Sequence, residues 1–263
     1  MRQASGYSVG EEVCIPPARV GEAEKRYTQA ALGVVLSGSF DYSAQNRVAT
    51  AVPGTVILGN PGDYFSCCTW ERRGHLRQVV YFQDEFLGEV AYDCGLESAS
   101  FQVTSIPPGR VSAAVFGRMR RLAVHSDDSD VAAYELAETA LHVNRSGLRA
   151  VLVSSLNQRR VLSIVRHLER YYHEPCSLAS LAGLARLSPY YFLRVFRKVT
   201  GQSPIQYVMS TRLRAAANDL LISKTPIAEI ALKTGFNDIS HFNASFRTVF
   251  GRSPRHWRAA KAS

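Results

Sequence analysis

The sequence predicts an α+β chain in two parts, a strand-rich N-terminal part that continues into helices and an all-α C-terminal part. Three observations support this. Residues 1–107 contain many short β-prone runs separated by Gly- and Pro-rich turns. Residues 108–155 carry apolar side chains at helical spacing. Residues 156–263 contain one two-helix pattern twice, and the 263-residue chain is long enough for two domains.

The β-prone runs of the N-terminal part are short and regularly spaced. Turn residues such as Pro53-Gly54 and Pro61-Gly62 separate them. The runs are residues 27–36, 40–42, 47–51, 56–58, 64–68 and 78–82. Many short strands of this kind predict a small antiparallel barrel or a sandwich.

Two helices are expected after residue 108. Val111, Val115, Met119 and Leu122 share one helical face, and residues 132–142 form a second helical run. These helices could pair two subunits of a homodimer. A helical layer packed on the barrel of a monomer would give the same pattern, so the oligomeric state stays open.

Charge is distributed unevenly along the chain. From Leu156 onward there are 17 Lys and Arg against 5 Asp and Glu, a net charge of +12, whereas the preceding residues carry 14 against 17, a net of −3. This asymmetry indicates a polyanionic partner for the C-terminal part, nucleic acid before membrane, and a merely solubilising surface is the alternative. No apolar run approaches the roughly 18 residues that cross a bilayer. The polar start does not resemble a signal peptide, so we expect a cytoplasmic protein.

The C-terminal part contains an internal repeat with a period of 50 residues. Of seven aligned pairs, six are identical and one pairs two aromatic residues. The pairs are Phe192 and Phe242, Phe196 and Phe246, Arg197 and Arg247, Gly201 and Gly251, Ser203 and Ser253, Pro204 and Pro254, and Tyr207 and Trp257. One structural unit therefore occurs twice.

Each repeat predicts two short helices joined by a tight turn. In the first repeat, Ser188-Pro189 is an N-cap followed by proline that opens the second helix, and Gly201 ends it. In the second repeat, Gly235-Phe236 forms the turn. Two helix-turn-helix units are thus expected at about residues 178–199 and 227–250.

The second helix of each repeat has a Phe stripe, which we interpret as core, and an opposite polar face. An α-helix fits the major groove of DNA, where Arg can bind guanine and Asn can bind adenine. The expected DNA-contacting residues are Tyr190, Leu193, Arg194, Arg197 and Lys198 in the first repeat and Ser240, Asn243, Ala244 and Arg247 in the second. Because Ala244 is the counterpart of Arg194, the second repeat should read fewer bases.

A linker helix is expected to join the repeats, starting at Ser203-Pro204 and ending near Ile222. At about 1.5 Å per residue it spans roughly 28 Å. A spacer of this length would hold two recognition helices about one DNA turn apart, near 34 Å. Both helices could then enter successive major grooves on one face of the duplex.

These motifs resemble the DNA-binding domain of the AraC/XylS family of transcriptional regulators, over about residues 156–258. The resemblance rests on the run Gly235 to Arg247, on Phe250-Gly251-Arg252-Ser253-Pro254 and Trp257-Arg258, and on Ser188-Pro189, Tyr191-Phe192 and Gly201-Gln202-Ser203-Pro204. It implies that Tyr190, Leu193 and Arg194 face bases in the first repeat, and that Ser240, Asn243 and Ala244 do so in the second.

The resemblance extends more weakly to the N-terminal part, through the Gly-Ser-Phe-Asp-Tyr turn at residues 38–42 and the Pro-Gly turns. It implies a cupin-like barrel that binds a small effector or mediates dimerisation. It also implies promoter DNA and RNA polymerase as partners and activation of transcription as the outcome.

Metal or thiol sensing is a weaker hypothesis. Cys67-Cys68, Cys14, Cys94 and His75 lie in the N-terminal part, but no pair shows a zinc-site spacing such as C-x₂-C, and buried cysteine is commonly inert. A cupin-type metalloenzyme needs several His and Glu ligands on neighbouring strands. Only His75 lies among the predicted strands, while His125 and His142 fall in helical segments. We therefore expect no catalytic residue, metal or cofactor.

Two alternatives remain open. One is an alkylation-repair regulator, in which similar helix-turn-helix units accompany a zinc-bound acceptor cysteine, and it requires four clustered thiolates. The other is an architectural protein that binds DNA without sequence preference and has no regulatory input. That protein should bind unrelated DNAs about equally.

Overall fold

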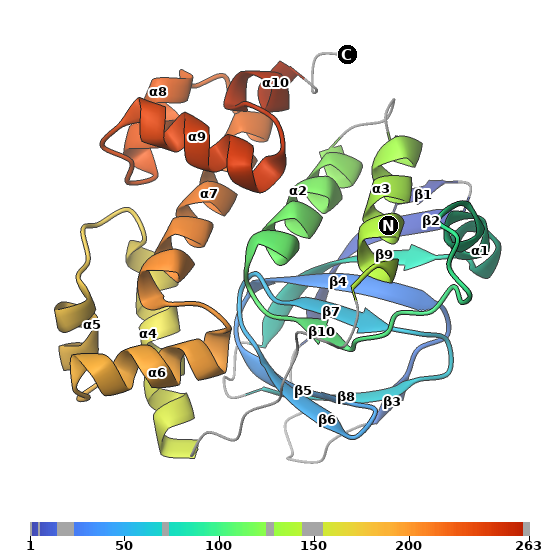
Figure 1. Ribbon diagram of the computed structural model, residues 1–263, viewed down its shortest axis with the longest axis horizontal. Coiled ribbons are helices and arrows are strands. Elements are labelled where there is room, and N and C mark those ends of the chain that lie inside the picture. The colour runs from blue at the N-terminus through green and yellow to red at the C-terminus, as the bar shows by residue number, and fades with distance from the viewer. Residues whose placement is uncertain are drawn as a thin grey trace. The chain divides into compact units, whose positions relative to one another are not determined.

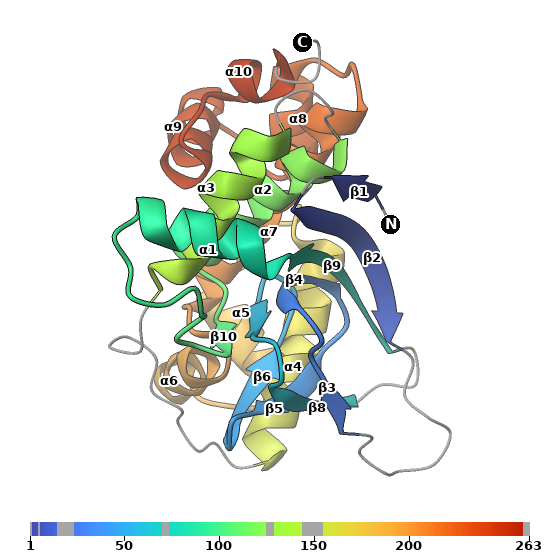
Figure 2. The same cartoon turned by 90° about the vertical axis from the view of Figure 1, so that its right-hand side faces the viewer.

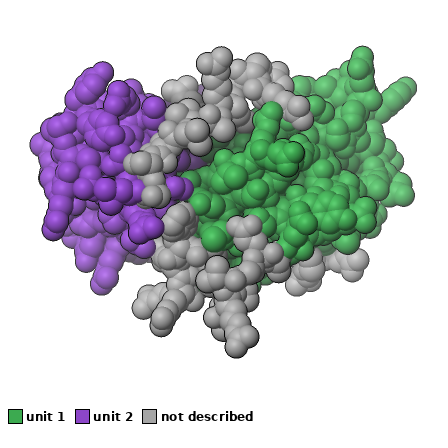
Figure 3. All heavy atoms as spheres, turned by 90° about the horizontal axis from the view of Figure 1, so that it is seen from below, with its two compact units in different colours: residues 1–107, 121–150 green, residues 108–120, 151–263 purple. Residues whose placement is uncertain are grey.

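The computed structural model describes residues 2–4, 6–14, 24–69, 74–124, 129–143 and 155–259. The chain divides into two compact units (Figure 3): unit 1 comprises residues 1–107 and 121–150, and unit 2 comprises residues 108–120 and 151–263. The expected helical region 108–155 is shared between the two units. Its expected end near residue 155 adjoins residues 144–154, which lie outside the described part, as does His125.

Unit 1 is built mainly from strands that form two antiparallel sheets (Figure 1). One sheet has the order β1-β2-β9-β4-β7-β10 and the other the order β3-β8-β5-β6. The strands are β1 (Arg2–Ala4), β2 (Tyr7–Cys14), β3 (Lys25–Arg26), β4 (Ala30–Ser37), β5 (Phe40–Ala44), β6 (Arg47–Ala51), β7 (Val56–Gly59), β8 (Tyr64–Thr69), β9 (His75–Phe82) and β10 (Ser105–Ile106).

A hydrophobic core joins the two sheets. Val35 and Val79 from the first sheet and Phe40, Tyr42 and Phe65 from the second are buried in one cluster. The α+β fold with an N-terminal strand-rich part is thereby confirmed. In the described residues the strands form two separate sheets around this core, so the closed barrel that the family resemblance implied is not formed there.

The sequence did not predict β1, β2, β3, β10 or helix α1 (Asp84–Asp93) of unit 1, and β2 and α1 are the longest of these. The residues of strand β2 include Glu11 and Glu12, which indicate a polar segment, yet the Glu12 carboxylate pairs with Arg77 of β9. Helix α1 (Asp84–Asp93) falls in a segment that was expected to be strand-like. Its signal is a buried face formed by residues spaced as in a helix, Leu87, Val90 and Ala91, after two acidic residues in the first turn.

Helices α2 (Arg110–Val124) and α3 (Ser129–Leu141) follow as the sequence predicts. Val115, Met119 and Leu122 of α2 are fully buried, but Val111 is 45% exposed and does not belong to that face. The first part of α2 belongs to unit 2. A side chain at Gly117 would lie 2.7 Å from Phe250 and 2.9 Å from Trp257, so only glycine allows this close approach.

Unit 2 consists of helices in the described residues, and Figures 1 and 2 show them from two directions. They are the early part of α2, α4 (Ser155–Tyr171), α5 (Leu178–Leu184), α6 (Pro189–Thr200), α7 (Pro204–Ile222), α8 (Ile227–Lys233), α9 (Ile239–Phe250) and α10 (Pro254–Ala259). The linker helix begins and ends as predicted. None of the described helices combines the length and the apolar character needed to span a membrane.

Candidate nucleic-acid interface

Local capping fixes the start and the end of α6 and α9, the second helix of each repeat. The Ser188 side chain accepts a hydrogen bond from the Tyr191 backbone N–H, and the Asp238 side chain accepts from Ser240 and His241. Gly201 and Gly251 end the two helices with φ of 76° and 72°, a left-handed conformation that favours glycine. The sequence repeat therefore gives α6 and α9 equivalent start and end points.

The same aromatic geometry recurs in both repeats. Tyr207 packs edge-to-face on Phe196, with ring centroids 5.8 Å apart and an interplanar angle of 81°. Trp257 packs on Phe246 with values of 5.8 Å and 79°. All four rings are at most 1% exposed. Burying an aromatic side chain of this size stabilises the fold by roughly 1.5–3 kcal/mol, which holds the opposite faces of α6 and α9 towards solvent.

The turns between the two helices of each repeat differ. In the first repeat the left-handed position is occupied by Arg186 (φ 55°), and in the second by Gly235 (φ 92°). A Cβ atom at Gly235 would lie 2.8 Å from both the Arg212 side chain and the His173 carbonyl oxygen. The glycine is therefore required twice, by its φ and by the close contact.

Arg212, on the linker helix, connects the two repeats. Its Nε donates to the Tyr172 carbonyl (2.6 Å) and its Nη2 to the Glu174 carbonyl (2.9 Å), both in the loop before α5. Its Nη1 donates to the Gly235 carbonyl (2.7 Å), in the turn of the second repeat. One planar guanidinium therefore ties the loop that leads into the first repeat, and the turn of the second repeat, to α7.

Glu169 anchors α4 to the linker helix. One of its carboxylate oxygens accepts from the Tyr207 hydroxyl (2.8 Å), the Thr211 hydroxyl (2.9 Å) and the Arg214 guanidinium (2.9 Å). Burial keeps the pKa of Tyr207 well above its ordinary value of 10, so its hydroxyl remains a donor. This network fixes α4, the helix that precedes the first repeat, on α7.

The outward face of α6 carries the residues predicted from its spacing. Tyr190 is 78% exposed, Arg194, Arg197 and Lys198 are exposed, and Leu193 is half-buried. The α6 sequence contains no acidic residue. The structure therefore brings the predicted cations of the first repeat together on one helix that faces solvent.

The Arg194 guanidinium is positioned by an aromatic neighbour, Tyr191. It lies 5.0 Å from the centroid of the Tyr191 ring, a cation–π arrangement. The Tyr191 hydroxyl in turn accepts a hydrogen bond from Asn157 on α4 (3.0 Å). Sequence analysis did not assign this role to either residue, because α4 is brought beside α6 only by the tertiary fold.

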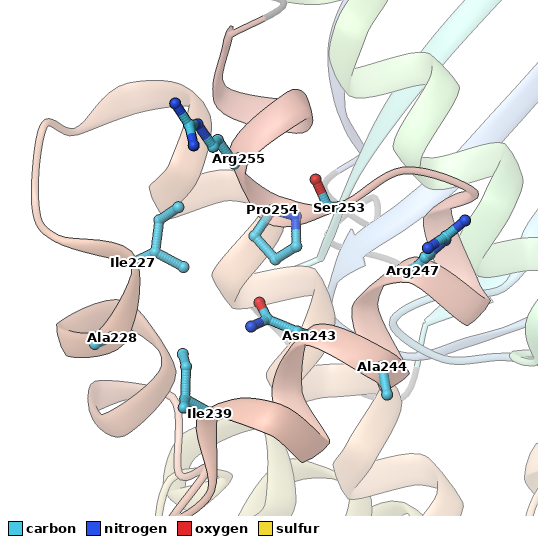
Figure 4. A pocket seen from close by; sticks show the side chains of 9 residues that line it. All are labelled: Ile227, Ala228, Ile239, Asn243, Ala244, Arg247, Ser253, Pro254 and Arg255. Carbon is cyan, nitrogen blue, oxygen red and sulfur yellow. The ribbon is translucent and has the colours of Figure 1, made fainter.

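The outward face of α9 borders an open hollow of about 610 Å³. Figure 4 shows Asn243, Ala244 and Arg247 on one side of it. The remaining lining residues are Ile227, Ala228, Ile239, Ser253, Pro254 and Arg255. Of the predicted contact residues in this repeat, Ser240 is also exposed on α9 but does not line the hollow.

Arg255 is a functional candidate that the sequence analysis missed. It lies on α10, which the Ser253-Pro254 cap starts directly after α9. The structure places it at the same hollow as Arg247, so the second repeat presents two cations there (Figure 4). In the sequence, Arg255 is a basic residue directly after the Ser253-Pro254 cap, outside the second helix of the repeat from which the contact residues were predicted.

Unit 1 contains a polar cluster between its sheets. The buried Arg77 guanidinium forms an ion pair with Glu12 (2.8 Å), and the Tyr81 hydroxyl also donates to Glu12. Nearby, the hydroxyls of Tyr27 and Tyr42 are 3.1 Å apart. Burial raises the pKa of Tyr27 to about 12, so the pair stays neutral.

His75 is also buried inside unit 1, where it contacts an aromatic ring. It is 2% exposed and stacks on the Phe40 ring, with centroids 3.7 Å apart. Within the described residues neither ring nitrogen has a hydrogen-bond partner. Burial lowers the pKa of His75 to about 4, so the ring is neutral at physiological pH. Unpartnered buried nitrogens of this kind call for an explanation, and a bound molecule would supply one.

The two neighbouring cysteines of the sensing hypothesis, Cys67 and Cys68, do not face one common site. Cys67 and Cys68 are neighbours on β8 and so point to opposite faces of the sheet, Cys67 half-buried against the core and Cys68 exposed. Burial raises the pKa of the Cys67 thiol to about 11, which keeps it protonated and unreactive. All five cysteines, including Cys14, Cys94 and Cys176, are free thiols.

Comparison with known proteins places these repeats in a family. A family model described as a helix-turn-helix domain matches residues 181–260. The Transposon Tn10 TetD protein of Escherichia coli is 32% identical over 101 residues, which cover 38% of this chain and 73% of TetD. The chain belongs to the AraC/XylS family. The regulatory protein SoxS of Escherichia coli is 28% identical over 102 residues, 39% of this chain and 95% of SoxS.

Among solved structures, the DNA-binding domain of the global transcriptional factor AdpA in complex with a target DNA is 31% identical. The similarity covers 38% of this chain and 91% of that domain, with a TM-score of 0.38. Other curated relatives are matched over 54% and 45% of their own length. Membership of the AraC/XylS family makes this chain a DNA-binding transcriptional regulator.

The alkylation-repair alternative within this family finds no support in the geometry. It needs four thiolates around one zinc ion. In the part of the chain that the structure describes, which includes all five cysteines, no group of three or more metal-ligating side chains contains more than one cysteine. Binding to DNAs of different sequence distinguishes the architectural alternative from sequence-specific regulation.

Proposed function

We propose that this AraC/XylS-family chain activates transcription at promoters that carry two recognition blocks, one for each repeat. The observation that carries the proposal is the pair of equivalent helices, α6 and α9, each with a buried Phe stripe and an exposed opposite face. The 19-residue helix α7 separates them. At about 1.5 Å per residue this spacer measures roughly 28 Å, which suits two grooves about one turn apart.

In this proposal the first repeat supplies most of the base recognition. Arg194 binds guanine O6 and N7, since its guanidinium is exposed and positioned by Tyr191. Tyr190 and Leu193 make apolar contacts with bases, and Arg197 and Lys198 neutralise phosphates. Stacking on Tyr191 supports the base-reading role, because a pre-positioned side chain loses less conformational entropy on binding.

The second repeat reads fewer bases. Asn243 binds adenine, and Ser240 and Ala244 lie against base edges without a charged contact. Arg247 binds phosphate, and Arg255 joins it from the other side of the hollow. The second repeat therefore contributes more to positioning than to discrimination.

Unit 1 is proposed to bind a small effector between its two sheets, beside His75 and the Arg77–Glu12 pair. A molecule there would satisfy the unpartnered ring nitrogens of His75. Helices α2 and α3 are the proposed homodimer contact, and a surface of the DNA-bound regulator contacts RNA polymerase. The protein acts in the cytoplasm without catalysing a reaction of its own.

The test is selection of binding sites from a random double-stranded DNA library, followed by titrations of the selected site at several salt concentrations. Two enriched blocks about one helical turn apart are the expected result. One block alone would mean that the second repeat binds only the backbone. Equal, salt-sensitive binding to all sequences would refute sequence-specific regulation and favour the architectural alternative.

Two matched variants separate base reading from phosphate contact. Arg194→Ala should cost about 1–3 kcal/mol at the selected site and flatten the preference at one base position. Lys198→Ala, on the same helix, should weaken binding to all sequences alike and lower the salt slope by about one. If Arg194→Ala also lost affinity uniformly, its proposed role in base recognition would be wrong.

A further inference from the structure

Three side chains with metal-binding atoms meet in unit 1, away from the interior cluster. Cys94 directly follows α1, Glu138 lies in the last turn of α3, and His142 directly follows α3, four residues after Glu138. One ligand atom of each lies within 4.8 Å of those of the other two. Among the described residues this is the one group of three or more such side chains.

The packing of α1 against α3 holds these residues together. The two helices lie side by side within unit 1 (Figures 1 and 2). Val90 and Ala91 of α1 are buried, as is Ala137 of α3. The Tyr134 hydroxyl donates to the Asp93 carboxylate (3.1 Å), next to Cys94 in the chain. The group is thus positioned by a buried interface and by a hydrogen bond beside it.

His142 already has the arrangement of a metal-binding histidine. Its Nδ1 lies 2.9 Å from the Glu138 backbone carbonyl, which can only accept, so Nδ1 carries the proton and donates. The lone pair of a neutral ring is then on Nε2, which is the usual state of a histidine that binds a metal. Because His142 is exposed, its ring can turn towards an ion without disturbing the core.

The types of ligand identify the class of ion. A thiolate excludes Mg²⁺ and Ca²⁺, which prefer oxygen ligands alone, whereas thiolate, imidazole and carboxylate together suit Zn²⁺. Tetrahedral bonds of about 2.0–2.3 Å place ligand atoms roughly 3.3–3.8 Å apart. The three ligand atoms all lie within 4.8 Å of one another, so they are near the spacing that one shared ion requires.

We propose that Cys94, Glu138 and His142 bind one Zn²⁺ ion, with the fourth position open to water. The sequence analysis expected no metal here, because the cysteine and the histidine are 48 residues apart and show no local spacing. The ion fastens the end of α1 to the end of α3. Since the thiol must lose its proton to bind, affinity rises with pH.

The experiment uses the full chain after treatment with a chelator, with Co²⁺ as a spectroscopic probe and Zn²⁺ as its competitor. We expect one Co²⁺ per chain, a thiolate-to-cobalt charge-transfer absorption, and loss of that absorption when Zn²⁺ is added. No uptake, or uptake without the thiolate absorption, would overturn the proposal.

Three variants assign the site. Cys94→Ser should abolish the thiolate absorption, and His142→Ala should weaken Zn²⁺ binding at least about 10-fold. Cys68→Ser, at an exposed cysteine outside the group, should leave both unchanged. His142 is exposed, so its replacement tests the site without a risk to folding. The assignment would be refuted if the thiolate absorption persisted in Cys94→Ser or disappeared in Cys68→Ser. It would also be refuted if His142→Ala left the affinity for Zn²⁺ unchanged.

Discussion

The side chain of Arg212 gives the sharpest test of how the two repeats are held relative to each other. In the Arg212→Ala variant, three hydrogen bonds to the carbonyls of Tyr172, Glu174 and Gly235 are lost together. A hydrogen bond from a charged donor is worth about 1.5–3 kcal/mol when shielded from solvent. The side chain is half-buried, so water can replace part of each bond, and we expect a total loss of about 2–4 kcal/mol in the free energy of unfolding.

Arg212→Lys is the matched control for charge. The ammonium group keeps the positive charge, but it cannot place three donors in the plane of the guanidinium. We expect it to recover at most about one of the three bonds, and hence to lose roughly two thirds as much stability as Arg212→Ala. Urea denaturation of the full chain, followed by circular dichroism, measures both variants.

DNA binding gives a second readout of the same change. The Arg212 side chain joins the loop that leads into the first repeat to the turn of the second repeat. Its loss should weaken binding to a site with two blocks by about 10-fold or more, because the second repeat is no longer pre-positioned. Binding to a site with only the first block should change little. A loss of less than about 0.5 kcal/mol in stability, or equal weakening on one-block and two-block sites, would refute the role of Arg212 as a connection between repeats.

Three further predictions concern the fold. Phe246→Ala should cost about 3–5 kcal/mol in unfolding free energy, because the ring is fully buried against Trp257; a loss below 1 kcal/mol would contradict this. Arg186→Gly should stabilise by about 0.5–1 kcal/mol, since it relieves a positive φ, and a lower melting temperature would count against it. The pKa of His75 falls from 6.5 to about 4 on folding, so its contribution is complete above pH 6.5 and is lost as pH decreases towards 4; His75→Phe should flatten that part of the stability–pH curve.

The pH effect of His75 can be bounded from its pKa. Each pKa unit corresponds to about 1.4 kcal/mol, so the shift from 6.5 to about 4 bounds the lost stability at roughly 3 kcal/mol. The unfolded chain takes up a proton below pH 6.5 while the buried ring does not, which fixes the sign. If the wild type and His75→Phe lost stability in parallel between pH 6.5 and 4, other groups would be responsible.

The second repeat shows how far sequence reasoning reaches at the candidate interface. The exposed positions of α9 followed from its spacing, because the Phe stripe defines which face is buried. Arg255 was missed because it lies on the next helix and reaches the hollow only through the turn at Ser253-Pro254. Residues on one helix can be placed from periodicity, but residues that meet from two helices cannot.

Unit 1 was harder to predict, for a related reason. The short strands between Ala30 and Phe82 were recognisable from their turns, yet β2 was missed because Glu12 is polar and its partner Arg77 lies on a strand far along the chain. An ion pair between distant strands leaves no local signal in either segment. The proximity of Cys94 and His142 was likewise not predictable from the sequence, because the two residues are far apart along the chain.

The sequence by itself determined the properties that depend on neighbouring residues: the helix boundaries set by Ser188 and Gly201, the repeat, the buried Phe stripes, the basic charge and the family. These follow from capping, helical periodicity and composition, which act over one or two turns. Only the tertiary structure decided which distant groups meet. Arg212 with the carbonyls of Tyr172, Glu174 and Gly235 is one example, and His75 stacked on Phe40 inside unit 1 is another, because such contacts depend on how whole helices and sheets pack.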